Sequence, residues 1–364
     1  MAKFCGLVCF CIVIAFGFII NGCIAEEKIG IYELKKGNLS IKVTNYGAHI
    51  ISLFLPDKHG KLDDVLLGYD TIKEYLNDTS SFGATIGRVA NRIAGAQFTL
   101  NGTLYKLIPN EGKNTLHGGP KGFSKVVWKV KKYQPEGDAP HIIFTYHSFD
   151  GEQGFPGDLL VTTAYTLHGE NQLSITMKAK ALNKPTPVNL VNHAYWNLGG
   201  HNSGDILSEE IQIFGSKYTP LNSELIPTGE IASVKGTPYD FLKPYIIGSK
   251  IRKLPNGYDI NYALDDKKTG RGSSKVLKKA AIVYDKKTGR ALHLFTNQPG
   301  VQFYTSNTLT QKGKGGYVYK PFAALCLETQ GYPDAVHHPN FPSTIVYPGK
   351  AYKHYMLIKF SIAS

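Results

Sequence analysis

The feature of this sequence that most constrains its fold is a hydrophobic period of two. Short β-branched and aromatic runs, such as residues 49–54, 159–165 and 173–177, are separated by Gly, Asn, Asp or Pro every dozen residues or so. This alternation is typical of β-strands. Helical periodicity is rare, and its best example, residues 71–76, is short. Many strands without alternating helices predict an all-β fold, a large antiparallel β-sandwich.

One hairpin can be placed from its turn. The text Asp-Lys-Lys-Thr-Gly occurs at residues 266–270 and again at 285–289, and the second copy lies between the apolar runs 281–284 and 291–294. A turn between two such runs predicts a β-hairpin. No linker, low-complexity tract or solenoid repeat interrupts the chain. We therefore expect residues 26–364 to form one domain with unusually large sheets.

The first 25 residues have the pattern of a secretory signal peptide. Lys3 precedes an uncharged apolar run over residues 4–20, and Cys23-Ile24-Ala25 supplies small residues for cleavage before Glu26. The run is also near the shortest length that spans a bilayer, so an uncleaved N-terminal membrane anchor is the alternative. Both interpretations predict entry into the secretory pathway, and cleavage predicts a secreted protein without a membrane segment.

Cysteine and sequon positions agree with that compartment. Four of the five cysteines lie in the leader, which leaves Cys326 without an intramolecular disulfide partner. Asn-x-Ser/Thr sequons at Asn38, Asn77 and Asn101 are candidate glycosylation sites.

The chain is basic, with 41 Lys plus Arg against 28 Asp plus Glu and a formal net charge of +13. The lysines occur as scattered pairs beside turn residues, and no stripe with interleaved aromatics appears, so we do not expect a nucleic-acid partner. A solvated basic surface is the favoured interpretation. Weak attachment to an acidic polysaccharide is the alternative.

Several kinds of site are absent from the sequence. No Gly-Lys pair is followed by the Ser or Thr of a phosphate-binding loop, and there is neither a Gly-x-Ser-x-Gly nor a His-Glu-x-x-His motif. The 12 histidines are dispersed. Nucleotide, redox and zinc chemistry are therefore not expected, and we predict no cofactor and no metal.

Four segments are polar where strands are usually apolar. In residues 87–94, followed by 116–119, Asn and Arg either donate to sugar hydroxyls or form surface pairs. In residues 187–197, alternation places His193 on one face with Tyr195, and Ala194 and Trp196 on the other. His193 is then either a sugar-cleft residue or a hydrogen-bonded core histidine.

The other two segments are residues 300–304 and 324–330. Gln302 and Tyr304 share one face of the first. Glu328 follows an uncharged run and is expected to end a buried strand, where a carboxylate is costly unless paired and often marks a functional site. Asp259 is a weaker candidate, because Asn-Gly beside Asp is common in turns.

Six sequence motifs, most of them from these segments, together resemble the aldose 1-epimerase, or galactose mutarotase, family. They occur in the order GRVANRIA, LHGG, PVNLVNHAYWNL, NGYD, QPGVQFYTSN and LETQGYPDAVHHPNFPS. The resemblance implies an isomerase that interconverts the α and β anomers of free aldoses such as D-galactose and D-glucose. It also implies a monosaccharide as the substrate, and nothing in the sequence demands more than a monomer.

The resemblance assigns roles to matching residues. It implies that Glu328 takes the proton from the C1 hydroxyl as general base and that His193 protonates the ring oxygen as general acid. The remaining matches are substrate-binding positions: Asn91, Arg92, His117, Tyr195, Asp259 and Gln302. We expect the acid and base to stand on different sides of the sugar and a carboxylate such as Asp259 to hold His193 protonated.

Two other functions stay open. A glycoside hydrolase or lyase on a similar sandwich would use Glu328 and Asp259 as paired carboxylates. A secreted sugar-binding or trafficking protein would keep the cleft with little or no catalysis.

Overall fold

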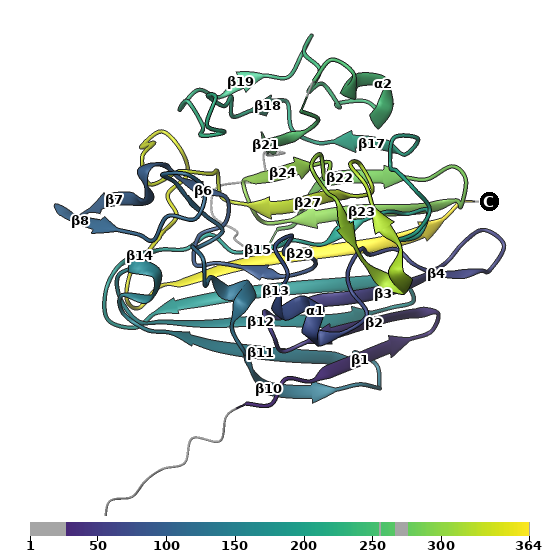
Figure 1. The fold of residues 1–364 in the computed structure, drawn as a ribbon, viewed down its shortest axis with the longest axis horizontal. Helices are drawn as coiled ribbons and strands as arrows, with labels where there is room; N and C mark the ends of the chain where they lie inside the picture. The colour runs from purple at the N-terminus through teal and green to yellow at the C-terminus, as the bar shows by residue number, and fades with distance from the viewer. Residues whose placement is uncertain (1–26, 255, 266–275, 364) are drawn as a thin grey trace, which may run out of the picture.

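Two large antiparallel sheets dominate the computed structural model, which describes residues 27–254, 256–265 and 276–363 (Figure 1). The predicted leader, its cysteines and the turn 266–270 lie outside the described residues. The predicted all-β sandwich is confirmed. In the described residues, no helix is long and apolar enough to span a membrane.

The larger sheet has nine strands. In spatial order they are β10 (Lys129–Gln134), β11 (His141–Ser148), β12 (Leu159–His168), β13 (Gln172–Ala181), β29 (Ala351–Ile362), β23 (Arg290–Thr296), β22 (Lys278–Tyr284), β17 (Glu210–Ile213) and β20 (Tyr245–Ile246). The C-terminal strand β29 thus lies in the middle of the sheet, between β13 and β23. The predicted hairpin is confirmed as β22 and β23, which pair antiparallel around residues 285–289.

A six-stranded sheet packs on one face of the larger sheet. Its strands, in order, are β16 (Tyr195–Trp196), β27 (Leu325–Gln330), β24 (Gly300–Tyr304), β21 (Asp259–Ala263), β18 (Lys217–Tyr218) and β19 (Ala232–Ser233). A four-stranded sheet comprises β1 (Ile31–Lys36), β2 (Leu39–Thr44), β3 (Ile50–Pro56) and β4 (Leu62–Asp64).

Short strand pairs, two α-helices and four 3-10 helices complete the described elements. The 3-10 helices are η1 (Ala94–Ala96), η2 (Phe123–Lys125), η3 (Glu152–Gly154) and η4 (Lys314–Gly316). The pairs are β14 (Thr186–Pro187) with β28 (Ile345–Val346), β15 (Val191–Asn192) with β5 (Thr85–Ile86), β25 (Gln311–Lys312) with β26 (Val318–Tyr319), β6 (Arg92–Ile93) with β9 (Thr115–Leu116), and β7 (Gln97–Leu100) with β8 (Thr103–Lys106). The predicted helix is confirmed as α1 (Ile72–Leu76), which begins with a capping box between Thr71 and Glu74. The second helix is α2 (Ile247–Ile251).

The core between the sheets follows from the period-two pattern. Ile175 of β13 and Ile358 of β29 are buried in one hydrophobic cluster with Phe303 of β24 and Leu327 of β27. Since side chains alternate along a strand, the neighbours of the core residues in β24 and β27 point away from this cluster. That second face of the six-stranded sheet carries the polar residues described next.

The expectation that Glu328 ends its strand is wrong. Thr329 and Gln330 continue β27 by pairing with Val301 and Gly300, so Glu328 lies inside the strand, opposite Gln302. The strand can continue because Thr329 and Gln330 are buried with hydrogen-bond partners, which polar residues in a strand interior require.

Candidate active site

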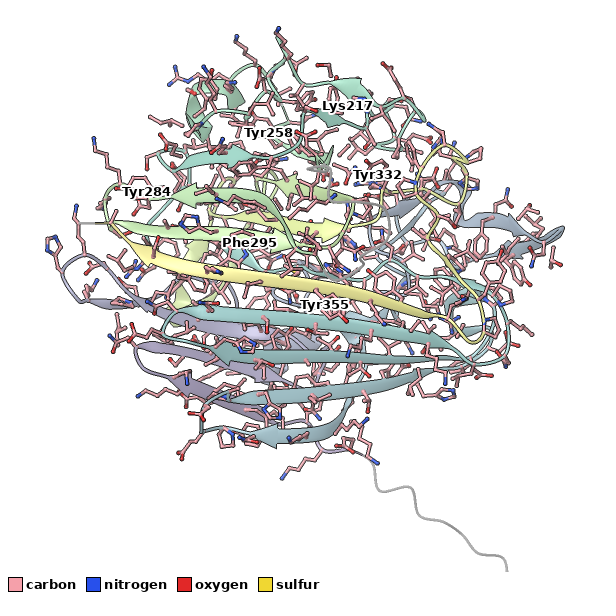
Figure 2. The ribbon with its side chains drawn as sticks, turned by 180° about the vertical axis from the view of Figure 1, so that it is seen from behind. Lys217, Tyr258, Tyr284, Phe295, Tyr332 and Tyr355 are labelled. Carbon is pink, nitrogen blue, oxygen red and sulfur yellow. The ribbon has the colours of Figure 1, made fainter. Side chains whose placement is uncertain are left out.

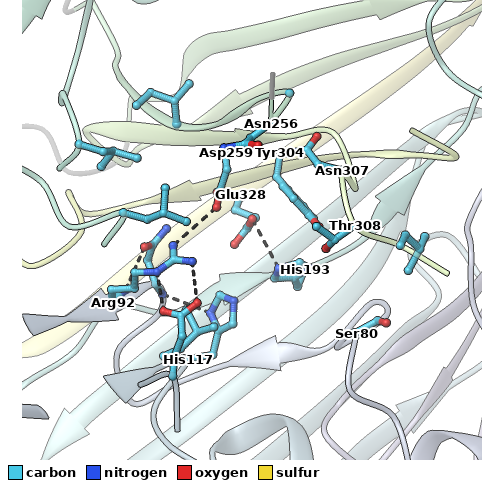
Figure 3. A pocket seen from close by; sticks show the side chains of 18 of the residues that line it. Ser80, Arg92, His117, His193, Asn256, Asp259, Tyr304, Asn307, Thr308 and Glu328 are labelled. Carbon is cyan, nitrogen blue, oxygen red and sulfur yellow. Dashed lines mark hydrogen bonds and ion pairs between the residues drawn. The ribbon is translucent and has the colours of Figure 1, made fainter. Parts of the chain in front are cut away.

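A cavity of about 980 Å³ opens on the face of the six-stranded sheet that points away from the core (Figure 3). Strands β21 and β27 supply Asp259 and Glu328, and the segment between β15 and β16 supplies His193. The segments around β6 and β9 add Asn91, Arg92 and His117. Residues far apart in the chain are thereby brought to one wall.

His193 and Glu328 face each other on this wall. Nε2 of His193 lies 3.6 Å from Oε1 of Glu328, and both side chains are almost completely buried. That the acid and the base stand on different sides of the sugar stays a prediction. O1 and the ring oxygen are both bonded to C1, so two facing groups at this distance can each reach one of them.

Oε2 of Glu328 is buried, and it has no hydrogen-bond partner among the described residues. An unpaired buried carboxylate oxygen is costly, and such a group commonly marks a site that a ligand completes. Burial raises the pKa of Glu328 well above its usual value, and Asp259 raises it further, while Arg92 opposes the shift. A raised pKa makes this carboxylate a stronger base.

Burial dominates the titration of His193 as well. It lowers the pKa of His193 to about 4, against the opposing effect of Asp259. Asp259 acts in the direction of the hypothesis that a carboxylate holds His193 protonated, but desolvation of the imidazolium outweighs that attraction. Together the two shifts favour the uncharged pair, with a proton on Glu328 and a neutral imidazole.

The predicted alternation around His193 is confirmed. His193 and Tyr195 line the cavity, with ring centroids 5.1 Å apart, whereas Ala194 and Trp196 are buried in the core. The Tyr195 hydroxyl donates to the backbone oxygen of Ser80 at 3.0 Å. Tyr195 therefore presents its ring, rather than a free hydroxyl, beside His193.

Arg92 is held by two acids. Its Nε and Nη2 donate to Glu111 at 2.6 and 2.8 Å, and its Nη1 lies 3.6 Å from Oδ2 of Asp259. Burial lowers the pKa of Arg92, but hydrogen bonding to Glu111 and the charge of Asp259 outweigh burial and raise it. The bidentate pair fixes the guanidinium plane at the cavity wall. For the arginines of this segment, the sequence left open a choice between ligand donors and surface pairs. Arg92 lies at the cavity wall, whereas Arg88 is buried and donates to the hydroxyl of Ser148.

The backbone of Asn91 and a close approach at Gly118 position His117. Its Nδ1 accepts the backbone N–H of Asn91 at 3.2 Å, so the proton of the neutral ring lies on Nε2. Burial lowers the pKa of His117 well below its usual value, and His193 and Arg92 add to this shift. The following residue, Gly118, has a φ of +83°, and a Cβ there would lie 2.0 Å from the oxygen of Gly87. The glycine is thus required for the close approach that positions this histidine.

Asn91 completes this corner of the site. Its Oδ1 accepts the backbone N–H of Arg92 at 2.9 Å, which leaves the Nδ2 group as the donor for a ligand.

Gln302 lies behind Asp259 and does not line the cavity itself. Gln330 donates to Oε1 of Gln302 at 3.1 Å, and Nε2 of Gln302 donates to Oδ1 of Asp259 at 2.6 Å. This chain of amides orients Asp259, so Gln302 reaches a ligand through that carboxylate.

Several cavity residues were missed by the sequence analysis. Tyr304 shares a strand face with Gln302, and Asn307 lies in the motif QPGVQFYTSN, so both could have been predicted as site residues from the sequence. Glu111 carried none, because it lies in a loop and meets Arg92 only in the folded chain. Within the described residues, no group of three His, Cys, Asp or Glu side chains is placed to hold a metal ion.

The fold and this wall define a class of protein, a large β-sandwich that presents a buried carboxylate and an imidazole in a polar cleft. A sequence profile of the aldose 1-epimerase family matches residues 30–359. The chain therefore belongs to the aldose 1-epimerase family.

Individual relatives agree with this assignment. The chain is 42% identical to a galactose mutarotase of Bos taurus over 96% of this chain and 98% of that protein. It is 35% identical to an aldose 1-epimerase of Escherichia coli over 87% and 91% of the two chains. A crystal structure of an aldose epimerase homologue from C. elegans superposes with a TM-score of 0.85 at 31% identity, covering 93% of this chain and 100% of the other.

Proposed function

We propose that this protein interconverts the α and β anomers of free aldoses, such as D-galactose and D-glucose, by acid–base opening and reclosure of the sugar ring. The observation that carries the proposal is the contact between His193 and Glu328 at the wall of the cavity. Family membership and the names of the relatives, galactose mutarotase and aldose 1-epimerase, support it. No cofactor is needed for this reaction.

The chemistry needs one proton removed and one delivered in the same event. Oε2 of Glu328 accepts the proton of the C1 hydroxyl, and Nε2 of His193 donates a proton to the ring oxygen. The C1–O5 bond breaks, and C1 becomes the carbonyl carbon of the open-chain aldehyde. Rotation about C1–C2 presents the other carbonyl face, and reclosure reverses both proton transfers.

The buried pair must hold one proton for this cycle. The protonated carboxyl with neutral imidazole and the carboxylate with imidazolium are tautomers with the same proton count. Burial favours the protonated carboxyl with the neutral imidazole. The proton transfers to and from the sugar start from the carboxylate with the imidazolium. A proton shift from Glu328 to His193, whose facing atoms are 3.6 Å apart, connects them.

The other polar groups orient the sugar. Arg92, His117 and Asn91 provide donors at one side of the pair, and Asp259, fixed by Gln302, provides acceptor oxygens. Fixed donors and acceptors around C1 favour the geometry in which both proton transfers are short.

Polarimetry tests the activity. Purified protein added to freshly dissolved α-D-galactose should speed the approach to the equilibrium rotation in proportion to its concentration. Galactose binding without acceleration would support the sugar-binding alternative. Release of reducing ends from a polysaccharide would support a hydrolase or lyase.

The secretory route remains a separate proposal. Asn38, Asn77 and Asn101 are all exposed and lie in turns, which supports their use as glycan acceptors. We expect glycosidase treatment of protein from the native source to lower its mass, and N-terminal sequencing to begin at Glu26. An unchanged mass with Met1 retained would argue against this route.

A further inference from the structure

Figure 2 shows the outer face of the nine-stranded sheet, with Phe295 and Tyr355, whereas the cavity opens on the six-stranded sheet that packs against the other face. Within the part of the chain that the structure describes, no helix or strand covers this face. Alternation makes it easy to define, since Ile175 and Met177 of β13 point into the core while Thr176 and Lys178 point outward. The family's reaction makes no use of this face.

The charge on the strands of this sheet is almost entirely positive. Among its nine described strands, Glu210 of β17 is the only acidic residue. The exposed lysines on the outer face of its central strands are Lys178, Lys180, Lys279, Lys353 and Lys359. They come from three strands that are distant in the sequence, so the expectation of merely scattered lysines is revised by the fold.

Three of these lysines form one group. Lys178 of β13 pairs directly across from Lys353 of β29, and Lys180 lies two residues further along β13. No acidic side chain among the described residues bridges their ammonium groups. Like charges directly opposite each other destabilise a sheet, so this arrangement costs stability unless an anion lies over it.

A second group surrounds Phe295. The ammonium groups of Lys279 and Lys359 lie 5.7 and 5.5 Å from the centre of its ring. His293 is the cross-strand partner of Lys359 and, with Phe295, lines a shallow hollow of about 540 Å³. Burial lowers the pKa of His293, and the two lysines lower it further. Glu170 is the one acidic residue at the edge of this hollow.

Two simpler explanations do not account for the pattern. Lysines often protect an edge strand from aggregation, which suits Lys129 of β10, but β13 and β29 lie in the middle of the sheet. A face selected for solubility alone would mix both signs of charge and form cross-strand ion pairs.

We propose that this face binds a linear acidic polysaccharide through the two lysine groups. Lys353 and Lys359 are six residues apart along β29, which separates the groups by about 20 Å. Between them on this face lie the half-buried side chains of Thr176 and Tyr355, which pair across β13 and β29. An extended polyanion whose charges recur along its length can reach both groups at once.

The shape of the face disfavours other polyanions. Duplex grooves are read by a protruding element, and no described helix or strand protrudes from the outer face of this sheet. Single strands stack on free aromatic faces, whereas Phe295 has lysine ammonium groups over its ring. A polysaccharide bound here leaves the cavity open, because the two sites are on opposite faces of the sandwich.

The test compares two triple variants of equal charge. Lys178→Gln/Lys180→Gln/Lys353→Gln removes the first group, and Lys73→Gln/Lys235→Gln/Lys320→Gln removes three exposed lysines elsewhere. Binding to heparin and to polygalacturonate is measured at two salt concentrations, with DNA and anionic lipid vesicles as competitors. Heparin distinguishes sulfate from the carboxylate of polygalacturonate.

We expect the face variant to lose about tenfold or more in affinity and to show a weaker salt dependence, while the control variant stays within about threefold of wild type. Both variants should keep full mutarotation activity. Equal losses in the two variants, no loss in either, or tighter binding to DNA or vesicles than to both polysaccharides would overturn the proposal.

Discussion

Nε2 of His193 and Oε1 of Glu328 lie 3.6 Å apart, although the two residues are 135 positions apart in the sequence. The sheet makes this contact by pairing Tyr195 of β16 with Cys326 of β27. Each functional residue lies two positions from that pair, so the sheet register itself sets the distance between the acid and the base. The predictions below follow from this contact and from the groups around it.

Removal of the imidazole should cost most of the turnover. His193→Asn is expected to lower kcat by about 10² to 10⁴, because the ring oxygen loses its proton donor. The KM for galactose should change much less. Initial rates by polarimetry measure both parameters. His168→Asn, a substitution of an exposed histidine, is the control and should retain normal rates. Near-full turnover in His193→Asn would remove His193 from the acid role.

Arg92 should act mainly on binding. Arg92→Lys keeps the charge but loses the bidentate geometry to Glu111, so both the donor and the orientation of Asp259 are disturbed. We expect the KM for galactose to rise about tenfold or more, with kcat within about threefold, since hydrogen bonds to charged groups contribute about 1.5–3 kcal/mol. Arg252→Lys, at an exposed arginine, should match the wild type. A fall in kcat at constant KM would contradict the binding role.

The pH profile should be bell-shaped, because the active pair holds one proton. As pH falls through about 4, the pair takes up a second proton and Glu328 can no longer act as a base. As pH rises through the raised pKa of Glu328, the pair loses its last proton and activity falls again. Measurement of kcat/KM across pH checks both limbs. Activity that keeps rising at high pH would contradict the requirement for a shared proton.

Acid should destabilise the fold through His354. This residue is fully buried, its Nε2 lies 2.7 Å from Oγ1 of Thr329, and burial lowers its pKa to about 3. Because the folded pKa lies below the unfolded value of about 6.5, the stabilising contribution is present above pH 6.5 and is lost progressively as pH falls toward 3. The full difference corresponds to roughly 4–5 kcal/mol.

Chemical denaturation at several pH values measures this effect. The free energy of unfolding of wild type should fall between pH 6.5 and pH 4, and His354→Asn should have a flatter dependence. His59→Asn, at an exposed histidine, should retain the slope of wild type. Equal slopes in all three proteins would contradict the assignment to His354.

The sequence carried enough information for much of the local structure and for most of the site residues. The period of two located β12, β13 and the β22–β23 hairpin, because one face of each strand meets the core. It also separated His193 from Ala194. The motif resemblance then joined His193 to Glu328, which spacing alone does not do.

What escaped prediction depends on long-range pairing. The placement of β29 between β13 and β23 creates both the central core and the outer lysine groups, and no local pattern specifies it. The lowered pKa of His193 was not predicted either, because its desolvation depends on all the segments that the fold packs around it. Glu111 is a third case, because a surface-loop glutamate becomes a site residue only through Arg92.

Glu328→Gln tests the central claim most directly. The matched control is Glu209→Gln, because Glu209 is also buried with a raised pKa and an unpaired Oε2 but does not line the cavity. The measurement is the exchange rate between the anomeric proton signals of α- and β-galactose at equilibrium, by magnetisation-transfer NMR. We predict that Glu328→Gln lowers the exchange rate by about 10² to 10⁴ while galactose still binds, and that Glu209→Gln stays near wild type. Exchange at the wild-type rate in Glu328→Gln would show that another group removes the C1 hydroxyl proton.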